Sequence, residues 1–364
     1  MVSMGLPFLA DPDGVKNGAD GRSDEINTCI ACNQACLDNI FSRKTATCLV
    51  NPRACRETVL PFAAALRKKR VAVVGAGPAG LSCAETAAAR GHRVTLFESS
   101  GAIGGQFRLA MLIPGKEEFR ETMRYFTRRL ELSGVETILN RRARLEDVKD
   151  FDEIVIATGV RPRKISMPGA EGGNVFGYDE VIAGTRVVGD RVAIIGAGGI
   201  GFDMAEFLTS SGDSSGNNKG SFMDEWGVDT LYREAGGLKK PAAVQPKREI
   251  HLLQRKKTKP GAGLGKTTRW IHRAALKRHG VKLWNGVEYL GVTADGLKVN
   301  HQGVTVCINV DSVVVCAGQE SERDLADELD QAGIGFHMIG GCLRAGELDA
   351  QRAIGVGAEL ADSF

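Results

Sequence analysis

The chain has 364 residues, of which 43% are hydrophobic and 25% are charged, so its length and composition are those of a globular protein with room for two or three domains. The 47 basic and 44 acidic residues leave a formal net charge of only +3, which gives no reason to expect nucleic acid as a partner. No apolar run is long enough for a membrane span, and the first residues lack the basic and apolar regions of a signal peptide. We therefore expect a cytoplasmic protein with no membrane partner.

Five of the nine cysteines lie between residues 27 and 55, in the stretch NTCIACNQACLDNIFSRKTATCLVNPRAC. In a reducing compartment such a cluster is more often a metal site than a set of disulfides, although buried or incidental thiols are an alternative. Four of them, spaced C-x2-C-x3-C-x11-C, are the candidate ligands of a soft metal: Cys29, Cys32, Cys36 and Cys48. Cys55 is a less suitable fourth ligand than Cys48. The spacing lacks the second paired knuckle of a structural zinc site, so it favours an iron–sulfur cluster over zinc.

A dinucleotide-binding fingerprint comes next, where an apolar strand from Val71 to Val74 leads into a glycine-rich turn and an alanine-rich helix. The turn has the pattern G-x-G-x-x-G, formed by Gly75, Gly77 and Gly80. The glycines allow a tight turn, close approach of the backbone to a pyrophosphate, and close helix–strand packing. A second strand, from Arg93 to Phe97, ends at Glu98, where a carboxylate would bind an adenosine ribose and repel a 2′-phosphate.

Three later pieces indicate which dinucleotide this turn binds. They are Gly104-Gly105-Gln106-Phe107, then Ala157-Thr158-Gly159 after a strand from Glu153 to Ile156, and then HMIGGC, at 337–342, before a helix that should begin near Glu347. Together with the turn they resemble the FAD domain of two-dinucleotide-binding flavoproteins with a glutathione-reductase-like fold. This resemblance implies that the first turn holds FAD. The candidate FAD residues in these pieces are Gly105, Gln106, Thr158 and Gly341.

A second fingerprint repeats the strand–turn–helix pattern, with Gly196, Gly198 and Gly201 in the turn. Residues 210–247 are rich in Gly, Ser, Asn and Lys and indicate a surface insertion. The following strand, 249–253, leads into Arg255 and Lys256, where an NAD site would carry an acid. Two cations at this point would bind a 2′-phosphate, so we expect NADPH rather than NADH. The alternative is a solvated basic strand end.

The sequence thus predicts an α/β fold, with a three-layer Rossmann-like FAD-binding domain at 61–189 and 310–364. An NADPH-binding Rossmann-like domain is expected as an insertion at 190–309. Residues 1–60 should contain a short iron–sulfur segment, preceded by the end of another domain. A strand at 311–315 and Cys316-Ala317-Gly318 should return the chain to the FAD domain.

Seven motifs, which are CIACNQACLDNIF…CLVNPRAC, GAGPAG, GGQF, IPGKEEF, GAGGIGFD, LQRK and LGKTTRWIHR, closely resemble the family of bacterial NADPH-dependent 2,4-dienoyl-CoA reductases. The chain is also similar, more distantly, to trimethylamine dehydrogenase. The resemblance implies that a 4Fe–4S cluster is bound by Cys29, Cys32, Cys36 and Cys48. It implies FAD contacts from Ala79, Glu98, Gln106, Lys116 and Ala143. It implies NADPH contacts from Arg255 and Lys256.

The start of the chain departs from this family. Members begin with a (β/α)8 barrel that binds FMN and the dienoyl-CoA, and residues 2–12 look like the last strand of that barrel. Leu6 stands where the family has an arginine. We therefore expect neither an FMN site nor an acyl-CoA site in this chain.

The expected function is electron transfer from NADPH through FAD to a 4Fe–4S cluster. The chain would be the electron-input half of a 2,4-dienoyl-CoA reductase, which acts in the β-oxidation of unsaturated acyl chains. It could equally be a reductase subunit that serves a separate FMN barrel protein or another electron acceptor. No catalytic side chain is expected. The alternative is a non-catalytic, truncated gene product that binds nucleotides only.

Overall fold

The computed structural model describes residues 3–210, 219–242, 244, 246–346 and 348–364. The chain forms two compact units, which are described one at a time. Unit 1 comprises residues 1–111, 118–161 and 319–364, and unit 2 comprises residues 112–117 and 162–318. None of the helices that the structure describes is both long and apolar enough to cross a bilayer.

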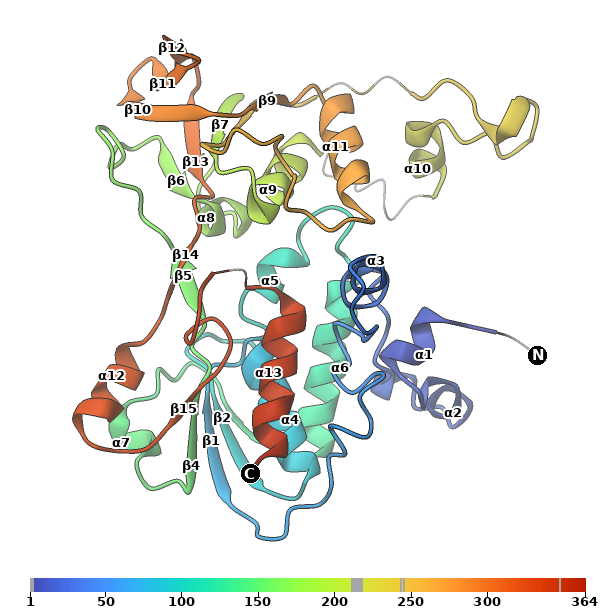
Figure 1. The fold of residues 1–364 in the computed structure, drawn as a ribbon, viewed down its shortest axis with the longest axis vertical. Coiled ribbons are helices and arrows are strands. Elements are labelled where there is room, and N and C mark those ends of the chain that lie inside the picture. Colours follow the sequence, from blue (N-terminus) through green and yellow to red (C-terminus); the bar gives the residue numbers. More distant parts are fainter. Residues whose placement is uncertain (1–2, 211–218, 243, 245, 347) are drawn as a thin grey trace. The chain divides into compact units, whose positions relative to one another are not determined.

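Unit 1 is built on a five-stranded parallel sheet of order β15-β4-β1-β2-β3 (Figure 1). Its strands are β1 (Arg70–Val74), β2 (Arg93–Phe97), β3 (Glu136–Ile138), β4 (Glu153–Ile156) and β15 (His337–Met338). Successive residues of a strand face opposite sides of the sheet, so β1 contributes to two cores. Val71 and Val73 pack with α4 (Pro78–Ala89), α6 (Phe119–Leu132) and α13 (Ala350–Asp362). Ala72 and Val74 pack with α7 (Leu145–Val148) and α12 (Asp324–Gln331), which completes the expected three layers.

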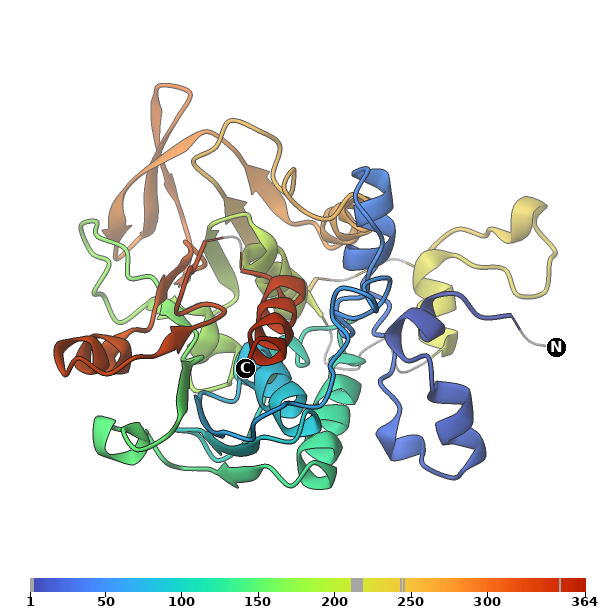
Figure 2. The same cartoon turned by 60° about the horizontal axis from the view of Figure 1, so that its bottom comes forward.

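Helices α4 and α13 lie side by side although they are far apart in the sequence (Figure 2). The close approach depends on Gly357 of α13, because a Cβ atom there would lie 2.3 Å from the backbone oxygen of Ala79. The helix therefore lies directly against the start of α4. Unit 1 also contains α5 (Phe107–Ala110).

Unit 2 has a five-stranded parallel sheet of order β6-β13-β7-β8-β9. Its strands are β6 (Val175–Gly177), β7 (Arg191–Ile195), β8 (Glu249–Leu253), β9 (Lys282–Trp284) and β13 (Ser312–Val315). One face packs against an antiparallel sheet of β10 (Val287–Thr293), β11 (Gly296–His301) and β12 (Val304–Ile308). Helix α9 (Gly199–Thr209) contacts β7 and β8, and α8 (Tyr178–Ile182) and α11 (Arg269–Arg278) contact α9. The chain thus contains two Rossmann-like domains, as the fingerprints predicted.

The observed boundaries between the units differ from the expected ones. Unit 2 begins at residue 162 rather than 190, because β6 pairs with β13 and so belongs to its sheet. It also includes Leu112–Glu117, which lie between α5 and α6 of unit 1. Strand β5 (Val160–Pro162) pairs with β14 (Gln319–Ser321) where the chain leaves and re-enters unit 1.

Of the expected insertion at 210–247, the described part contains helix α10 (Lys219–Trp226) and a bridge between Val228 and Leu238, and residues 211–218 lie outside the described part. The helix expected near Glu347 is α13, which begins at Ala350; Glu347 itself is outside the described residues.

The segment before the first sheet contains short helices, and the expectation of a barrel strand at 2–12 was wrong for the described residues. Leu6–Ala10 form helix α1, with a proline in its first turn. Helices α2 (Gly14–Ala19) and α3 (Asn39–Phe41) follow, with a π-helical turn at Gln34–Asp38 between them. Packing stabilises α1 at this position, because Ala10 is buried in a core shared with the cysteine segment.

Candidate functional site

The first glycine turn, between β1 and α4, has the geometry that its sequence predicts. Gly75 has a φ of +107°, and a Cβ atom there would lie 2.4 Å from the backbone oxygen of Ala157. A Cβ atom at Gly80 would lie 1.9 Å from the backbone oxygen of Gly75. Gly77 differs from both, because a Cβ atom there would meet nothing within 4 Å. The outer glycines are thus required by the protein itself, whereas Gly77 leaves space at the N-terminus of α4 for an anion.

Glu98 lies beside this turn at the end of β2. Its carboxylate accepts hydrogen bonds from the backbone amides of Ala76 (2.9 Å) and Ser100 (2.8 Å). Its backbone oxygen accepts a hydrogen bond from the amide of Arg141, which brings the segment containing the buried Ala143 to the same place. Glu98 and the segment that contains Ala143 are therefore both located at the carboxyl end of β2.

The Gly104-Gly105-Gln106 segment crosses in front of the turn. The amide of Gly104 donates to the backbone oxygen of Ala76 (2.7 Å), and a Cβ atom at Gly105 would lie 3.0 Å from the Cα atom of Gly77. Gln106 accepts a hydrogen bond from the side chain of Gln319 (2.8 Å). Substitution of Gly105 would narrow the space at the turn.

The segment before α13 closes the other side of the same site. Gly340 has a φ of +65°, and a Cβ atom there would lie 2.8 Å from the Cβ atom of Ala79. Gly341 follows, and the thiol of Cys342 donates to the backbone oxygen of Ile156 (2.9 Å) at the end of β4. Thr158 follows the end of β4, and its hydroxyl donates a hydrogen bond to the backbone oxygen of Glu322 (2.6 Å). Apart from Lys116, the predicted FAD residues are all in unit 1. Their contact with FAD stays a prediction.

Unit 2 repeats the turn between β7 and α9. A Cβ atom at Gly196 would lie 2.3 Å from the backbone oxygen of Cys316, and one at Gly201 would lie 1.8 Å from the backbone oxygen of Gly196. Gly198, like Gly77, has nothing within 4 Å of an added Cβ atom. The two turns are therefore alike in which glycines the protein needs and which one leaves room for a ligand.

The basic pair predicted to read the 2′-phosphate lies on the loop after β8. Arg255 and Lys256 are exposed. The buried Gln254 fixes the loop, because its amide side chain donates to the backbone oxygens of Lys256 (3.1 Å) and Thr258 (2.5 Å). The backbone oxygen of Lys256 also accepts from the amide of Gly286 (2.9 Å). The loop backbone is therefore fixed while both cationic side chains face solvent.

Lys116 is placed differently from the other predicted FAD residues. It belongs to unit 2, where its ammonium group lies 2.6 Å from the carboxylate of Asp203 on α9. One turn further along α9, Glu206 accepts from Nδ1 of His272 (2.7 Å), and this hydrogen bond raises the pKa of His272. The charge of Lys116 is thus already partly balanced by a carboxylate.

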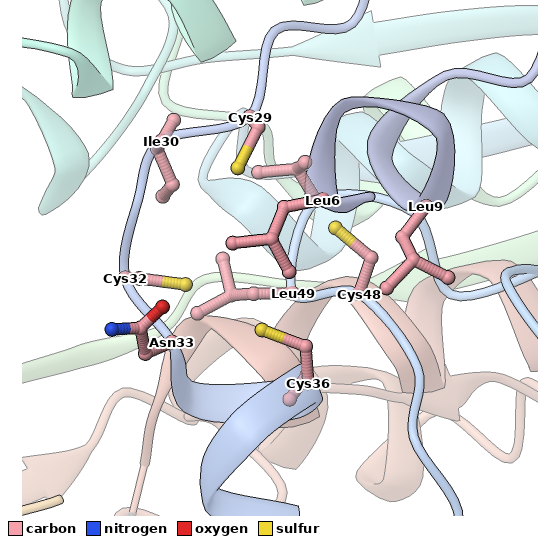
Figure 3. Close-up of a pocket in the computed structure, with 11 residues that line it drawn as sticks. Leu6, Leu9, Cys29, Ile30, Cys32, Asn33, Cys36, Cys48 and Leu49 are labelled. Atoms are coloured by element: carbon pink, nitrogen blue, oxygen red, sulfur yellow. The ribbon is translucent and has the colours of Figure 1, made fainter. Parts of the chain in front are cut away.

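Four cysteines of the N-terminal segment line one small pocket. Figure 3 shows the sulfur atoms of Cys29, Cys32, Cys36 and Cys48 directed towards a common space. The rest of the lining is almost entirely apolar: Leu6, Leu9, Ile30, Ala35, Leu49 and Val50, with the polar Asn33. Cys55 is exposed and does not line the pocket.

Burial affects the ionisation of these thiols. The pKa of Cys32 is raised to about 11, mainly by desolvation and to a lesser extent by the other three thiols. The pKa of Cys48 is raised for the same main reason. Cys32 therefore stays protonated near neutral pH unless a cation occupies the pocket, and binding such a cation would release its proton. A thiol-lined apolar pocket fits a soft metal group.

Side-chain hydrogen bonds join three of the segments that surround this pocket. Asp11 accepts from the amide of Asn27 (2.9 Å), whose side chain donates to the backbone oxygen of Val50 (2.9 Å). Asn51 donates to the backbone oxygen of Leu9 (2.9 Å). Helix α1, the loop before Cys29 and the loop around Cys48 are therefore fixed to one another.

Sequence reasoning did not identify the side chains that close this pocket. Leu6 and Leu9 reach it from α1, the helix found where a strand was expected. Two features of the sequence could have indicated this helix. Pro7 suits the first turn of a helix, and Leu6 and Leu9 are three residues apart, so they would lie on the same helix face. In the part of the chain that the structure describes, no group of three or more His, Cys, Asp or Glu side chains is arranged as a metal site.

Comparison with known proteins shows the family. The family model of the pyridine nucleotide-disulphide oxidoreductases matches residues 69–343, which is more than half of the chain. A metal reductase from Desulforamulus reducens is 32% identical over 90% of this chain and 49% of its own length. A cinnamate reductase from Clostridium sporogenes is 30% identical over 90% of this chain and 44% of its own length.

Among solved structures, a complex of 2-naphthoyl-CoA reductase with 2-naphthoyl-CoA superposes with a TM-score of 0.83 at 28% identity, over 99% of this chain and 50% of that one. The chain thus spans about half the length of the relatives that it matches. The two Rossmann-like sheets and both glycine turns lie within the matched region. The chain belongs to the pyridine nucleotide-disulphide oxidoreductase family.

Proposed function

We propose that the chain is an NADPH-dependent flavin and iron–sulfur oxidoreductase in which Cys29, Cys32, Cys36 and Cys48 hold a 4Fe–4S cluster. The observation that carries this proposal is the convergence of four thiols, and not of Cys55, on one apolar pocket. When bound, FAD would supply both two-electron and one-electron redox chemistry, and the cluster would supply one-electron chemistry.

The spacing of the cysteines in the sequence favours a cluster over zinc. The pattern C-x2-C-x3-C-x11-C lacks the second paired knuckle that structural zinc sites usually have. In the structure the same four cysteines line one pocket.

The protein side chains would bind and orient the cofactors. In unit 1 the open position at Gly77 and the N-terminus of α4 suit the pyrophosphate of FAD, and Glu98 suits its ribose. In unit 2 Gly198 and the start of α9 suit the pyrophosphate of NADPH, and Arg255 and Lys256 suit its 2′-phosphate.

We further propose that the electrons serve the reduction of an unsaturated acyl-CoA such as a 2,4-dienoyl-CoA. The sequence resemblance supports this, and so does the structural likeness to a reductase solved with 2-naphthoyl-CoA. The resemblance assigns acyl-CoA reduction to an FMN-binding barrel, on the same or another polypeptide. This chain would provide the electron input to that barrel or to another acceptor.

The test is to purify the 364-residue chain without oxygen and to measure flavin, iron and sulfide per chain, the visible spectrum, and NADPH-dependent reduction of ferricyanide. We expect about one FAD, four iron and four sulfide per chain, with steady turnover of NADPH. Stoichiometric zinc with no broad absorption near 400 nm would exclude the cluster. Bound nucleotides without any turnover would favour the alternative, a chain that binds nucleotides and catalyses nothing.

A further inference from the structure

The loop that leads into Cys29 is held by one arginine of unit 1. Arg124 lies on α6, and its guanidinium donates hydrogen bonds to the backbone oxygens of Asp24 and Ile26 (2.7 Å) and to the hydroxyl of Thr28 (3.2 Å). A longer contact reaches the backbone oxygen of Ser23 (3.4 Å). A single side chain therefore binds alternate residues of the loop up to the one that immediately precedes Cys29.

The geometry of an arginine explains why it suits this position. A guanidinium has five N–H donors in a rigid plane, so it can bind several acceptors at once, whereas a lysine ammonium is a point charge on a flexible stem. The remaining donor, Nε of Arg124, binds the carboxylate of Glu121 (2.7 Å), which lies one turn earlier on α6 and fixes the plane of the guanidinium.

Other residues of α6 contact the same segment. Phe119 and Met123 pack against the small core that contains Ile30 and contacts Cys29, Cys32 and Cys48. Arg128 lies 2.8 Å from the carboxylate of Asp24. Helix α6 thus contacts both the loop before Cys29 and the small core around the cysteines.

We propose that Arg124 is a positioning residue of the cysteine site. It holds residues 24–28 so that Cys29 faces the pocket, and it places a positive charge one residue away from that ligand. This inference rests on the proposed function, because it concerns the group that the four thiols would bind. A nearby positive charge favours the more negative, reduced form of such a group, so it should raise the reduction potential.

The proposal is tested with three variants of the whole chain, purified without oxygen. Arg124→Met removes the charge and the fork, Arg124→Lys keeps only the charge, and Arg120→Met is the control, because Arg120 is an exposed residue one turn earlier on the same helix. The readouts are FAD and iron per chain, the rate of iron loss to a chelator, and the reduction potential measured by spectroelectrochemistry.

We expect Arg124→Met to lose iron at least about tenfold faster than the unmodified chain and to have a lower potential, with its FAD content unchanged. Arg124→Lys should lose iron faster as well, yet keep a potential close to that of the unmodified chain. Arg120→Met should match the unmodified chain in every readout.

Each other outcome has a distinct meaning. An unmodified chain that holds no iron overturns the proposed function itself. An unmodified chain that holds iron, together with an Arg124→Met variant that keeps it equally well, overturns only the role of Arg124. Parallel loss of FAD and iron from Arg124→Met would assign Arg124 to the stability of unit 1 and would also overturn the positioning role.

Discussion

Two alanine substitutions in the same glycine turn should have different effects, since Gly80→Ala should lower stability and Gly77→Ala should lower FAD affinity. In Gly80→Ala the new Cβ atom would lie 1.9 Å from the backbone oxygen of Gly75, about 1.5 Å inside ordinary van der Waals contact. Neither atom belongs to a flexible side chain, so α4 must move relative to β1. Overpacking of this kind costs about 1–3 kcal/mol or more. In a unit of about 200 residues each 1 kcal/mol shifts the melting temperature by about 2–4 °C, so we expect that of the flavin-free chain to fall by about 2–12 °C.

Gly77→Ala adds the same methyl group where the protein has nothing within 4 Å. Gly77 is the N-cap of α4, with a φ of −76° and a ψ of 176° that alanine adopts readily, so the cost in stability should stay below about 1 kcal/mol. The methyl group would instead occupy the space of the pyrophosphate. We expect at least a tenfold loss of FAD affinity with an almost unchanged melting temperature.

The assay is titration of flavin-free protein with FAD, followed by fluorescence, and thermal unfolding of the same samples followed by circular dichroism. Normal FAD affinity in Gly77→Ala would show that the pyrophosphate does not lie at this turn. A Gly80→Ala variant that melts like the unmodified chain would show that the close approach of α4 to β1 is wrong.

Three further predictions address the other sites. Arg255→Ala should raise the KM for NADPH about tenfold, because an exposed charge-assisted hydrogen bond contributes about 1.5 kcal/mol. The kcat and the kinetics with NADH should barely change. Equal losses with both nucleotides in steady-state assays would mean that the loop has a structural role. Cys32→Ser should abolish iron binding and leave FAD bound, as measured by metal analysis and flavin fluorescence, and joint loss of both would contradict the separation of the two sites. The ion pair between His272 and Glu206 raises the pKa of His272, so its stabilising effect is present in full below the usual histidine pKa near 6.5 and is lost as pH rises through the raised value. The melting temperature of the chain should therefore fall between about pH 6 and pH 8, and His272→Gln should flatten that dependence; an identical pH profile in the variant would refute this assignment.

The elements that could be predicted from sequence are those with a local signal. The strands at 93–97, 153–156 and 249–253 match the expected ranges, because each is a short apolar run that ends at a glycine turn or at a polar residue. The glycine turns were equally accessible, since the G-x-G-x-x-G pattern encodes a steric requirement that the structure confirms at Gly80 and Gly201.

What sequence could not supply depends on tertiary packing. Residues 6–10 form a helix because Leu6, Leu9 and Ala10 cover the cysteine pocket and its core, and a five-residue stretch has no periodicity strong enough to show this. The boundary of unit 2 was misplaced because β6 has only three residues and belongs to its sheet solely through pairing with β13. Arg124 carries no motif at all, since its partners are backbone carbonyls about 100 residues earlier in the chain.

Unit 2 cannot be exchanged between homologues as one continuous segment, because Leu112–Glu117 belong to it but are separated in the sequence from residues 162–318. The chain crosses between the two units four times, after Met111, Glu117, Arg161 and Gly318, rather than twice as in a simple insertion. A chimera that exchanges only 162–318 would keep the host's Lys116 and import a foreign residue at the position of Asp203. Recombination that keeps unit 2 intact must transfer residues 112–117 together with residues 162–318, so we expect these two segments to have diverged as a pair.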